Sequence, residues 1–408
     1  MSSEALATCK PPLQVQVSPG PPADWREVVL SDVAHVNPET LRASTSPDFS
    51  FGYIDISQID GPGQCAGWAE QTFGEAPSRA RRKVRAGDIL VSTVRPYLRS
   101  FAQVPKADLP LVASTGFAVV RAGAEADQQF LFQHILHDSF IEHLTPRMTG
   151  SNYPAVSASD VEAYPISLPP LDEQRRIANV LRSVDEAIAA ADAVIIGLES
   201  AASEIAKRAF TDPDNVELEH EIVTFGDLFD IKGGNQPPKS SFIYQPKDGY
   251  VRLLQIRDFE SDDKAAYISE KSSNVRCGKD DILIARYGAS VGRILTGKAG
   301  AYNVALTKIV LRDRNILRRY AYHWLKSDYF QDRIIAVSNR SAQAGFNKED
   351  LFPTKIALPP LAKQADIAEA LDDMEKAVGA NRSESRQMNE VKGALLADLL
   401  SGHVRVPA

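Results

Sequence analysis

The sequence predicts a mixed α/β protein with two similar domains, joined by two long helices that pair as an antiparallel coiled coil and related by a pseudo-two-fold internal duplication. Three observations predict this fold. One motif occurs twice, short β-like runs precede each copy, and a long heptad pattern follows each copy. The chain of 408 residues is also too long for one hydrophobic core and suits two domains plus connectors.

The repeated motif is ISLPPLDEQRRIA at residues 166–178 and IALPPLAKQADIA at residues 356–368. The offset of 190 residues between Pro169 and Pro359 also aligns Asp160 with Asp350. A solenoid unit has only roughly 20 to 50 residues, so this repeat cannot be one turn of a solenoid. Each copy is therefore a domain followed by a connector.

Short β-like runs alternate with turn-rich loops in both domains. The strands that we expect lie at residues 51–56, 89–93, 117–120, 251–256, 282–285 and 308–311. One helix follows in each domain, at residues 128–143 and 317–336. The predicted segments are a flexible tail (1–23), a first large domain (24–165), a long helix with a linker (166–222), a second large domain (223–355) and a C-terminal long helix (356–408).

The long helices are predicted from apolar residues that recur in steps of four and three, the heptad seam of a coiled coil. The seam residues selected are Ile177, Leu181, Val184, Ile188, Ile195, Leu198, Ile367, Leu371, Met374 and Val378. The second seam also carries Asn381, Ser385 and Lys392, and polar seam residues can fix the register of a coil. A buried helix of an ordinary domain is the alternative, but residues 171–210 would span roughly 60 Å at about 1.5 Å per residue.

The composition is that of a globular protein, with 44% hydrophobic and 24% charged residues. No apolar run reaches the roughly 20 residues that a membrane span needs, and the proline-rich residues 1–23 lack the apolar core of a signal peptide. The three cysteines are scattered, without the spacing of a metal site. We expect a cytoplasmic protein that binds no membrane and no metal.

The net charge of −7 is distributed unevenly. Residues 24–165 carry 12 basic and 17 acidic side chains, whereas residues 223–355 carry 22 basic and 15 acidic ones. The acidic first domain still has a local basic cluster at residues 79–85. A DNA-binding surface is therefore compatible with the negative total.

Motifs for catalysis are incomplete. Gly292 to Ala299 approaches a phosphate-binding loop, but Ala299 stands where a Ser or Thr would hold magnesium. Asn152-Tyr153-Pro154-Ala155 only loosely matches the catalytic tetrad of adenine methylases. The seven histidines form no metal or nucleophile pattern. We expect a protein that is not an enzyme.

Basic, amide and tyrosine side chains instead gather in loops at matching places of the two copies. Arg and Lys suit phosphates and guanine, and Asn suits adenine, so these loops favour DNA contact over a merely solvated surface. The candidate DNA-binding residues are Arg79, Arg81, Arg82, Lys83, Arg95, Arg99, Arg147, Asn152, Tyr153, Arg286, Tyr287, Arg293, Lys298, Arg340, Asn347 and Lys348.

With its duplication, its paired motif and these loops, the chain resembles a specificity subunit of a type I restriction-modification system over residues 24–408. The resemblance implies two target recognition domains, each reading one half of a split asymmetric site in double-stranded DNA. It implies that the long helices act as a ruler and dock methylase subunits. A restriction subunit, the motor-nuclease, would join for cleavage. S-adenosylmethionine would then belong to the methylase, ATP and magnesium to the motor-nuclease, and no cofactor to this chain.

The second copy departs from the first at Ala362-Lys363, where the first has Asp172-Glu173. Two other functions compete with the resemblance. One is a non-catalytic coiled-coil scaffold with peptide-binding domains, against which salt-dependent DNA binding would argue. The other is an enzyme, such as a fragment of a fused methylase-nuclease, which methyl transfer by the purified chain would reveal.

Overall fold

The chain forms two compact units in the computed structural model, which describes residues 21–210, 212–213, 220–272, 274–312, 314–339 and 345–406. One unit comprises Met1–Ala191 with Glu384–Ala408, and the other comprises Asp192–Ser383. Each long helix therefore gives one half to each unit. Of the predicted flexible tail, residues 1–20 lie outside the described residues.

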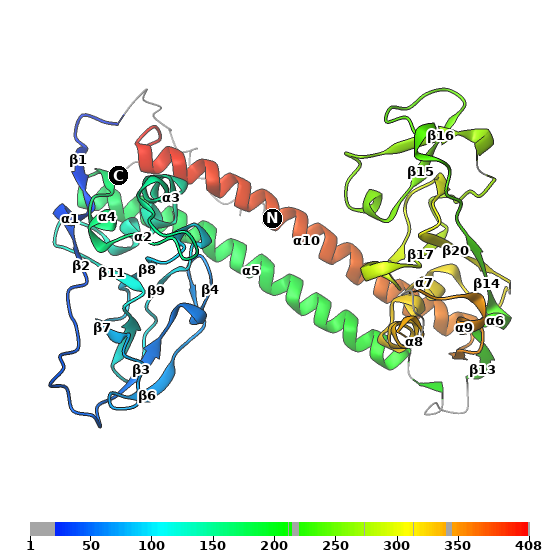
Figure 1. The fold of residues 1–408 in the computed structure, drawn as a ribbon, viewed down its shortest axis with the longest axis horizontal. Helices are drawn as coiled ribbons and strands as arrows, with labels where there is room; N and C mark the ends of the chain where they lie inside the picture. Colours follow the sequence, from blue (N-terminus) through cyan, green and yellow to red (C-terminus); the bar gives the residue numbers. More distant parts are fainter. Residues whose placement is uncertain are drawn as a thin grey trace, which may run out of the picture. The chain divides into compact units, whose positions relative to one another are not determined.

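The first unit is built on two four-stranded sheets (Figure 1). The antiparallel sheet has the order β2 (Ala34–Val36), β11 (Phe117–Ala122), β8 (Ile89–Ser92), β9 (Phe101–Gln103). The second sheet has the order β6 (Ala69–Thr72), β3 (Ser50–Ile54), β10 (Leu111–Ser114), β7 (Ala80–Val84), with β3 and β10 parallel. The smaller elements are β1 (Arg26–Val29) paired with β12 (Pro165–Leu168), β4 (Ile59–Gly61) paired with β5 (Gln64–Cys65), α1 (Leu30–Val33) and α4 (Ala158–Glu162).

The second unit repeats this plan. Its antiparallel sheet has the order β14 (Phe229–Gly233), β20 (Leu306–Leu311), β17 (Ile282–Ala285), β18 (Ile294–Leu295). The other sheet has the order β16 (Ala266–Ser269), β15 (Tyr250–Leu254), β19 (Ala301–Tyr302), with β15 and β19 parallel. The smaller elements are β13 (Glu221–Thr224) paired with β21 (Lys355–Leu358), α6 (Phe225–Leu228) and α9 (Lys348–Leu351). The predicted duplication of a mixed α/β domain is confirmed.

All six expected strands are present as β3, β8, β11, β15, β17 and β20; β17 has the predicted bounds, and the ends of the others differ by at most two residues. The single helix expected in each domain is wrong, because two helices occupy each segment. They are α2 (Gln128–Leu136) and α3 (Asp138–Leu144) in the first unit, and α7 (Arg318–Lys326) and α8 (Asp328–Ser338) in the second. The backbone is extended at His137 and Ser327, and each of these side chains accepts a hydrogen bond from the first turn of the next helix.

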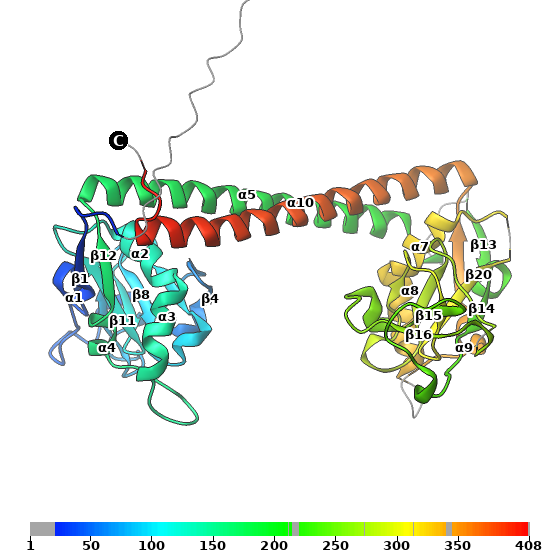
Figure 2. The same cartoon turned by 90° about the horizontal axis from the view of Figure 1, so that it is seen from above.

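The core of the first unit lies between this helix pair and the antiparallel sheet (Figure 2). Phe130 and Phe140 from the helices and Ile89 from β8 are fully buried in one cluster. Tyr320 and Phe330 from the helices and Ile282 from β17 are the corresponding buried side chains of the second unit. The loops at the strand ends are thereby carried on a rigid base.

The long helices α5 (Leu171–Ala209) and α10 (Leu361–Ser401) pack together within each unit. In the first unit, Ile177 and Leu181 share a cluster with Leu396 and Leu399. In the second, the end of α5 packs against the start of α10. The predicted antiparallel pairing is confirmed.

Every predicted seam residue is buried or half-buried in the structure. Ile177, Leu181, Ile195 and Leu371 are buried, and the half-buried ones are Val184, Ile188, Leu198, Ile367, Met374 and Val378. The polar seam residue Lys392 pairs with Asp185 at 2.5 Å. Across the described ranges, no helix combines enough length and apolar character to span a membrane.

The glutamine of the repeated motif fastens each long helix to its domain. Gln174 donates from Nε2 to the carbonyl oxygens of Pro169 (2.8 Å) and Glu125 (3.0 Å), and its Oε1 accepts from the Asp127 amide (2.8 Å). The side chain is fully buried, so these bonds have little competition from water. The sequence PPLxxQ therefore encodes a joint between helix and domain.

Glu173, which follows the same two prolines, joins the two ends of the described chain. Its carboxylate, 2% exposed, accepts from the Trp25 indole at 3.3 Å and pairs with Arg405 at 2.5 Å. Arg405 also pairs with Asp24 at 2.8 Å. The second copy has an exposed Lys363 at this position.

Candidate nucleic-acid interface

Two loops of the first unit meet at the end of β8. Val94 forms an antiparallel bridge with Ala155, and the Arg95 amide donates to the Pro154 carbonyl at 2.7 Å. Thr149 and Ala155 exchange backbone hydrogen bonds of 2.9 and 2.8 Å, which closes residues 150–154 into a projecting turn. Gly150 begins this turn with a φ of +94°, in the region that favours glycine.

Arg95 and Tyr153 stack on each other at this meeting point. The guanidinium carbon of Arg95 lies 4.7 Å from the centre of the Tyr153 ring, and Nη2 donates to the Asn152 carbonyl at 2.9 Å. Tyr153 is 70% exposed, and Asn152 is exposed beside it. The structure thus brings together three residues that the sequence placed in two separate loops.

The second unit has the same arrangement at the end of β17. Tyr287 bridges to Gly345 in antiparallel fashion, at the position that corresponds to Val94 and Ala155. The Arg286 guanidinium lies 5.1 Å from the Tyr287 ring centre. Its Nε donates to the Phe346 carbonyl at 2.9 Å and its Nη2 to Asn347 Oδ1 at 2.6 Å. A side chain at Gly345 would meet the Tyr287 ring at 2.7 Å, so glycine permits this close approach.

Five predicted cations are paired with carboxylates of their own unit. The pairs are Lys83 with Glu39, Arg99 with Asp138, Arg293 with Glu260, Lys298 with Asp262, and Lys348 with Asp230. Hydrogen bonds from Arg121 and Lys83 lower the pKa of Glu39 to about 2. Those from Arg252 and Lys298 lower the pKa of Asp262 to about 2. The positive charge of these residues is largely neutralised within the protein.

Four other predicted cations make no ion pair with a described carboxylate. Arg79 is exposed, Arg81 lies over the Phe73 ring at 4.8 Å, and Arg147 donates to the His143 carbonyl. Arg82 is half-buried, and burial lowers its pKa. Among the predicted cations that the structure describes, these four and Arg95 and Arg286 are the ones without an ion pair to a described carboxylate. Arg340, also predicted, lies outside the described residues.

The segment that approached a phosphate-binding loop has another structure. Ile294 and Leu295 form strand β18, and Ala301 and Tyr302 form β19, so no helix follows the Gly-Lys sequence. Lys298 binds the Asp258 carbonyl and Asp262. The segment therefore offers no helix terminus to a phosphate.

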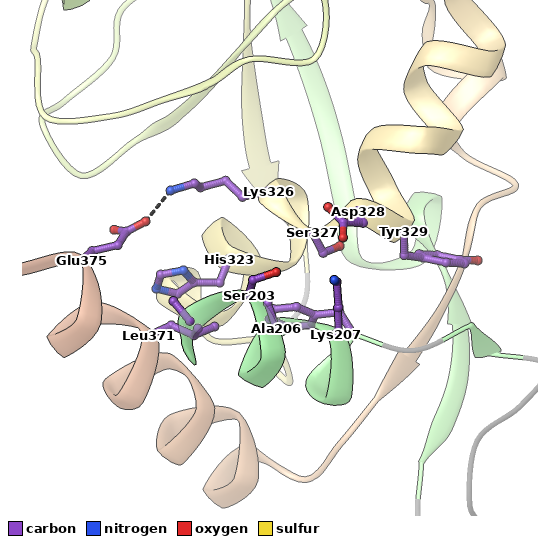
Figure 3. Close-up of a pocket in the computed structure, with 12 residues that line it drawn as sticks. Ser203, Ala206, Lys207, His323, Lys326, Ser327, Asp328, Tyr329, Leu371 and Glu375 are labelled. Atoms are coloured by element: carbon purple, nitrogen blue, oxygen red, sulfur yellow. Dashed lines mark hydrogen bonds and ion pairs between the residues drawn. The ribbon is translucent and has the colours of Figure 1, made fainter. Parts of the chain in front are cut away.

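A cavity of about 330 Å³ lies in the second unit, lined by α5, α7, α10 and the start of α8 (Figure 3). Figure 3 shows His323 and Leu371 at its wall and the ion pair between Lys326 and Glu375. His323 Nε2 lies 2.6 Å from Asp372 Oδ1. Arg319 Nε donates a hydrogen bond to the other oxygen of the same carboxylate.

His323, Asp372 and Glu375 have the residue types and proximity of a metal site. Both carboxylates are already paired with Arg319 and Lys326. Burial lowers the pKa of His323. His323, Asp372 and Glu375 therefore form a structural network of hydrogen bonds and ion pairs with Arg319 and Lys326.

Two features at the joints were not foreseen from the sequence. Gln174 and Gln364 occupy the same position of the repeated motif, and this recurrence is the sequence signal for the joints. The contact between Glu173 and Arg405 joins residues 232 positions apart, and only the unequal acidic pair of the two copies hinted at it. Both features hold the domains and helices in place; neither contacts the loops described above.

Comparison with known proteins bears on both units. The family model described as "Type I restriction modification DNA specificity domain" matches twice, at residues 22–199 and 217–390. A Methanocaldococcus jannaschii protein, provisionally named the type I restriction enzyme MjaX specificity subunit, is 24% identical and aligns with 94% of this chain and 95% of its own.

Solved structures give the same result. A chain from work on complex assembly and conformational transition of the type I R-M system has a TM-score of 0.58 and 26% identity, covering 95% of this chain and 99% of its own. The type I restriction-modification S subunit from M. genitalium has a TM-score of 0.60 at 16% identity, covering 92% and 96%, and shares the fold.

Proposed function

The chain belongs to the type I restriction modification DNA specificity family, and we propose that it reads a bipartite, asymmetric site in double-stranded DNA, one domain for each half-site. The observation that supports this best is the pair of equivalent loop junctions, at the ends of β8 and β17, that carry different side chains on the same backbone plan. Because side chains in the loops would contact the bases, two domains with the same scaffold and different loop sequences suit two half-sites of different sequence.

The long helices are proposed to hold the two domains at a set spacing and to dock methylase subunits. Their pairing supports this, because buried seams and polar seam contacts such as Lys392 with Asp185 fix one register. We further propose that a restriction (motor-nuclease) subunit joins this complex in the cytoplasm. S-adenosylmethionine would be bound by the methylase, ATP and magnesium by the motor-nuclease, and none of them by this chain.

The chain is proposed to contribute recognition without catalysis. The cations at the loop junctions suit phosphates and base edges. At the described cavity, by contrast, His323 lies within hydrogen-bond distance of Asp372, and the two carboxylates are paired with Arg319 and Lys326. Methyl transfer would then require the partner methylase.

Reconstitution with the methylase subunits of the same host tests the proposal. The purified chain alone should transfer no methyl groups to DNA, and the complex should methylate a motif with two specified parts and an unspecified spacer. Binding to pooled duplexes, followed by fluorescence anisotropy, should weaken steeply with salt. A complex that binds peptides and shows no salt-dependent DNA binding would support the scaffold alternative instead.

A further inference from the structure

Each unit carries one arginine stacked on a tyrosine, at the same point of the duplicated fold. Arg95 and Tyr153 lie at the bridge between Val94 and Ala155. Arg286 and Tyr287 lie at the bridge between Tyr287 and Gly345. The two pairs are not copies in sequence, since one tyrosine comes from the second loop and the other adjoins its arginine. Equivalent junctions of the two units therefore carry an arginine–tyrosine stack formed by residues at different sequence positions.

In both arginines, most of the N–H donors make no hydrogen bond to a described residue. Neither makes an ion pair with a described carboxylate, unlike Arg99 and Arg293 nearby. A guanidinium has five N–H donors. Arg95 uses one for the Asn152 carbonyl, and Arg286 uses two for neutral oxygens. Arg95 Nε is buried and has no hydrogen-bond partner among the described residues, so the donors that Arg95 can offer to a ligand are those of its two terminal nitrogens.

The arginines are also held in place before any ligand arrives. Arg95 has a φ of +49°, a left-handed conformation that is uncommon for a residue with a side chain and is here fixed by its backbone bond to Pro154. Arg286 is fixed through the carbonyl of Phe346 and the side chain of Asn347. A guanidinium that is already held in one orientation loses little side-chain entropy on binding. Its planar fork of N–H donors can match the acceptors of one base edge and not those of another.

From this geometry, and resting on the proposed function, we infer that the Arg95–Tyr153 and Arg286–Tyr287 pairs are the base-reading elements of the two domains. Each arginine offers a two-donor fork to a base with two adjacent acceptors in the major groove, which is guanine. The tyrosine beneath it fixes the guanidinium plane and presents an exposed aromatic edge to the neighbouring base pair. The ion-paired cations support the loops and do not read sequence.

Arginine-to-lysine variants test this inference, because they keep the charge and remove the fork. Each variant is assembled with the methylase subunits, and the methylated motif is determined on a randomised DNA library. Arg95→Lys should reduce discrimination at one position of one half-site by roughly 5- to 150-fold, and Arg286→Lys should do the same in the other half-site. In each case the unaltered half-site serves as the internal control for folding and assembly.

Matched controls come from the same loops. Arg99 has a φ of +53° and borders the same short turn as Arg95, but it is paired with Asp138. Arg99→Lys and Arg293→Lys should leave the motif unchanged. Tyr153→Leu, which removes the stacking partner alone, should relax the same position as Arg95→Lys.

The possible failures are distinguishable. A wild-type complex without sequence preference would overturn the proposed function itself. A selective wild-type complex whose motif is unchanged by Arg95→Lys and Arg286→Lys, or whose binding weakens equally for all sequences, would overturn the assignment of these arginines as base readers. Relaxation by Arg99→Lys to the same extent would overturn the distinction between free and ion-paired cations.

Discussion

Gln174 and Gln364, 190 residues apart, make the same three hydrogen bonds. Gln364 donates to the carbonyls of Pro359 (2.9 Å) and Asn315 (2.8 Å) and accepts from the Leu317 amide (2.9 Å), each partner lying 190 residues after its counterpart around Gln174. Both side chains are fully buried. The joint between helix and domain is therefore duplicated in full, even though the loops of the two domains differ.

Gln364→Ala should lower the free energy of unfolding by about 1 to 3 kcal/mol, because it removes three buried hydrogen bonds and leaves the Leu317 amide without the Gln364 oxygen. Chemical denaturation at neutral pH measures the change. Gln387→Ala, at an exposed position of the same helix, is the control and should have almost no effect. Equal effects of the two substitutions would show that the buried hydrogen bonds contribute nothing specific.

Leu181→Ala should cost about 2 to 5 kcal/mol in the free energy of unfolding, since Leu181 is fully buried against α10 in the core of the first unit. Ile196→Ala removes a similar side chain from the same helix at a position that is 67% exposed, and should change stability little. Leu181→Glu should be worse than Leu181→Ala, because it buries a charge. A Leu181→Ala variant as stable as Ile196→Ala would contradict the seam.

Acid should remove a stabilising contribution of Glu39. Its pKa in the folded chain is about 2, mainly through the hydrogen bond from Arg121, against an ordinary value of 4.5. A depressed folded pKa adds stability that is complete above the unfolded pKa and is lost as the pH falls through the folded pKa. The stability difference between wild type and Glu39→Gln should therefore be constant above about pH 5 and shrink between about pH 5 and 2.

Urea denaturation at a series of pH values measures this difference. Glu70→Gln is the control, because Glu70 is exposed on β6 and makes no ion pair with a described residue. A Glu39→Gln difference that grows as the pH falls would have the wrong sign for this mechanism.

Lengthening both long helices should change the spacing of the recognised half-sites. One heptad inserted after Ala191 and one after Ser383, where the compact units divide, preserves the seam and adds about 10 Å to the helices. Because DNA rises about 3.4 Å per base pair, the spacer should grow by about three base pairs, or binding should fail as the helical phase is lost. Unchanged recognition of the original site, with the methylase still bound, would show that the helices do not set the distance.

The duplication and the paired helices could be predicted because they are written as local repeats and heptad steps. The break within each helical segment could not, since Ser327 and His137 act there through hydrogen bonds to the next helix rather than through an apolar pattern. Helix was therefore predicted correctly for most of residues 128–143 and 317–336, but the break that divides each segment into two helices was missed.

The candidate interface was predictable only as a set of residue types. Lys298 and Asp262 are 36 residues apart, and Arg95 and Asn152 are 57 apart, so the sequence does not reveal which cations are neutralised and which stack on tyrosine. Separating these two groups required the tertiary structure. Of the predicted cations, Arg95 and Arg286 are the ones that it places in equivalent junctions with a tyrosine.

The methylated motif after a domain exchange tests most directly whether each domain reads one half-site. Residues 223–355 are replaced by the equivalent domain of a relative with a different motif, and the methylated bases are mapped by single-molecule sequencing alongside the wild-type complex. If each domain reads one half-site, both complexes should methylate a bipartite motif, with one half exchanged and the other half identical. A change in both halves, or in neither half, would contradict the assignment of one domain to each half-site.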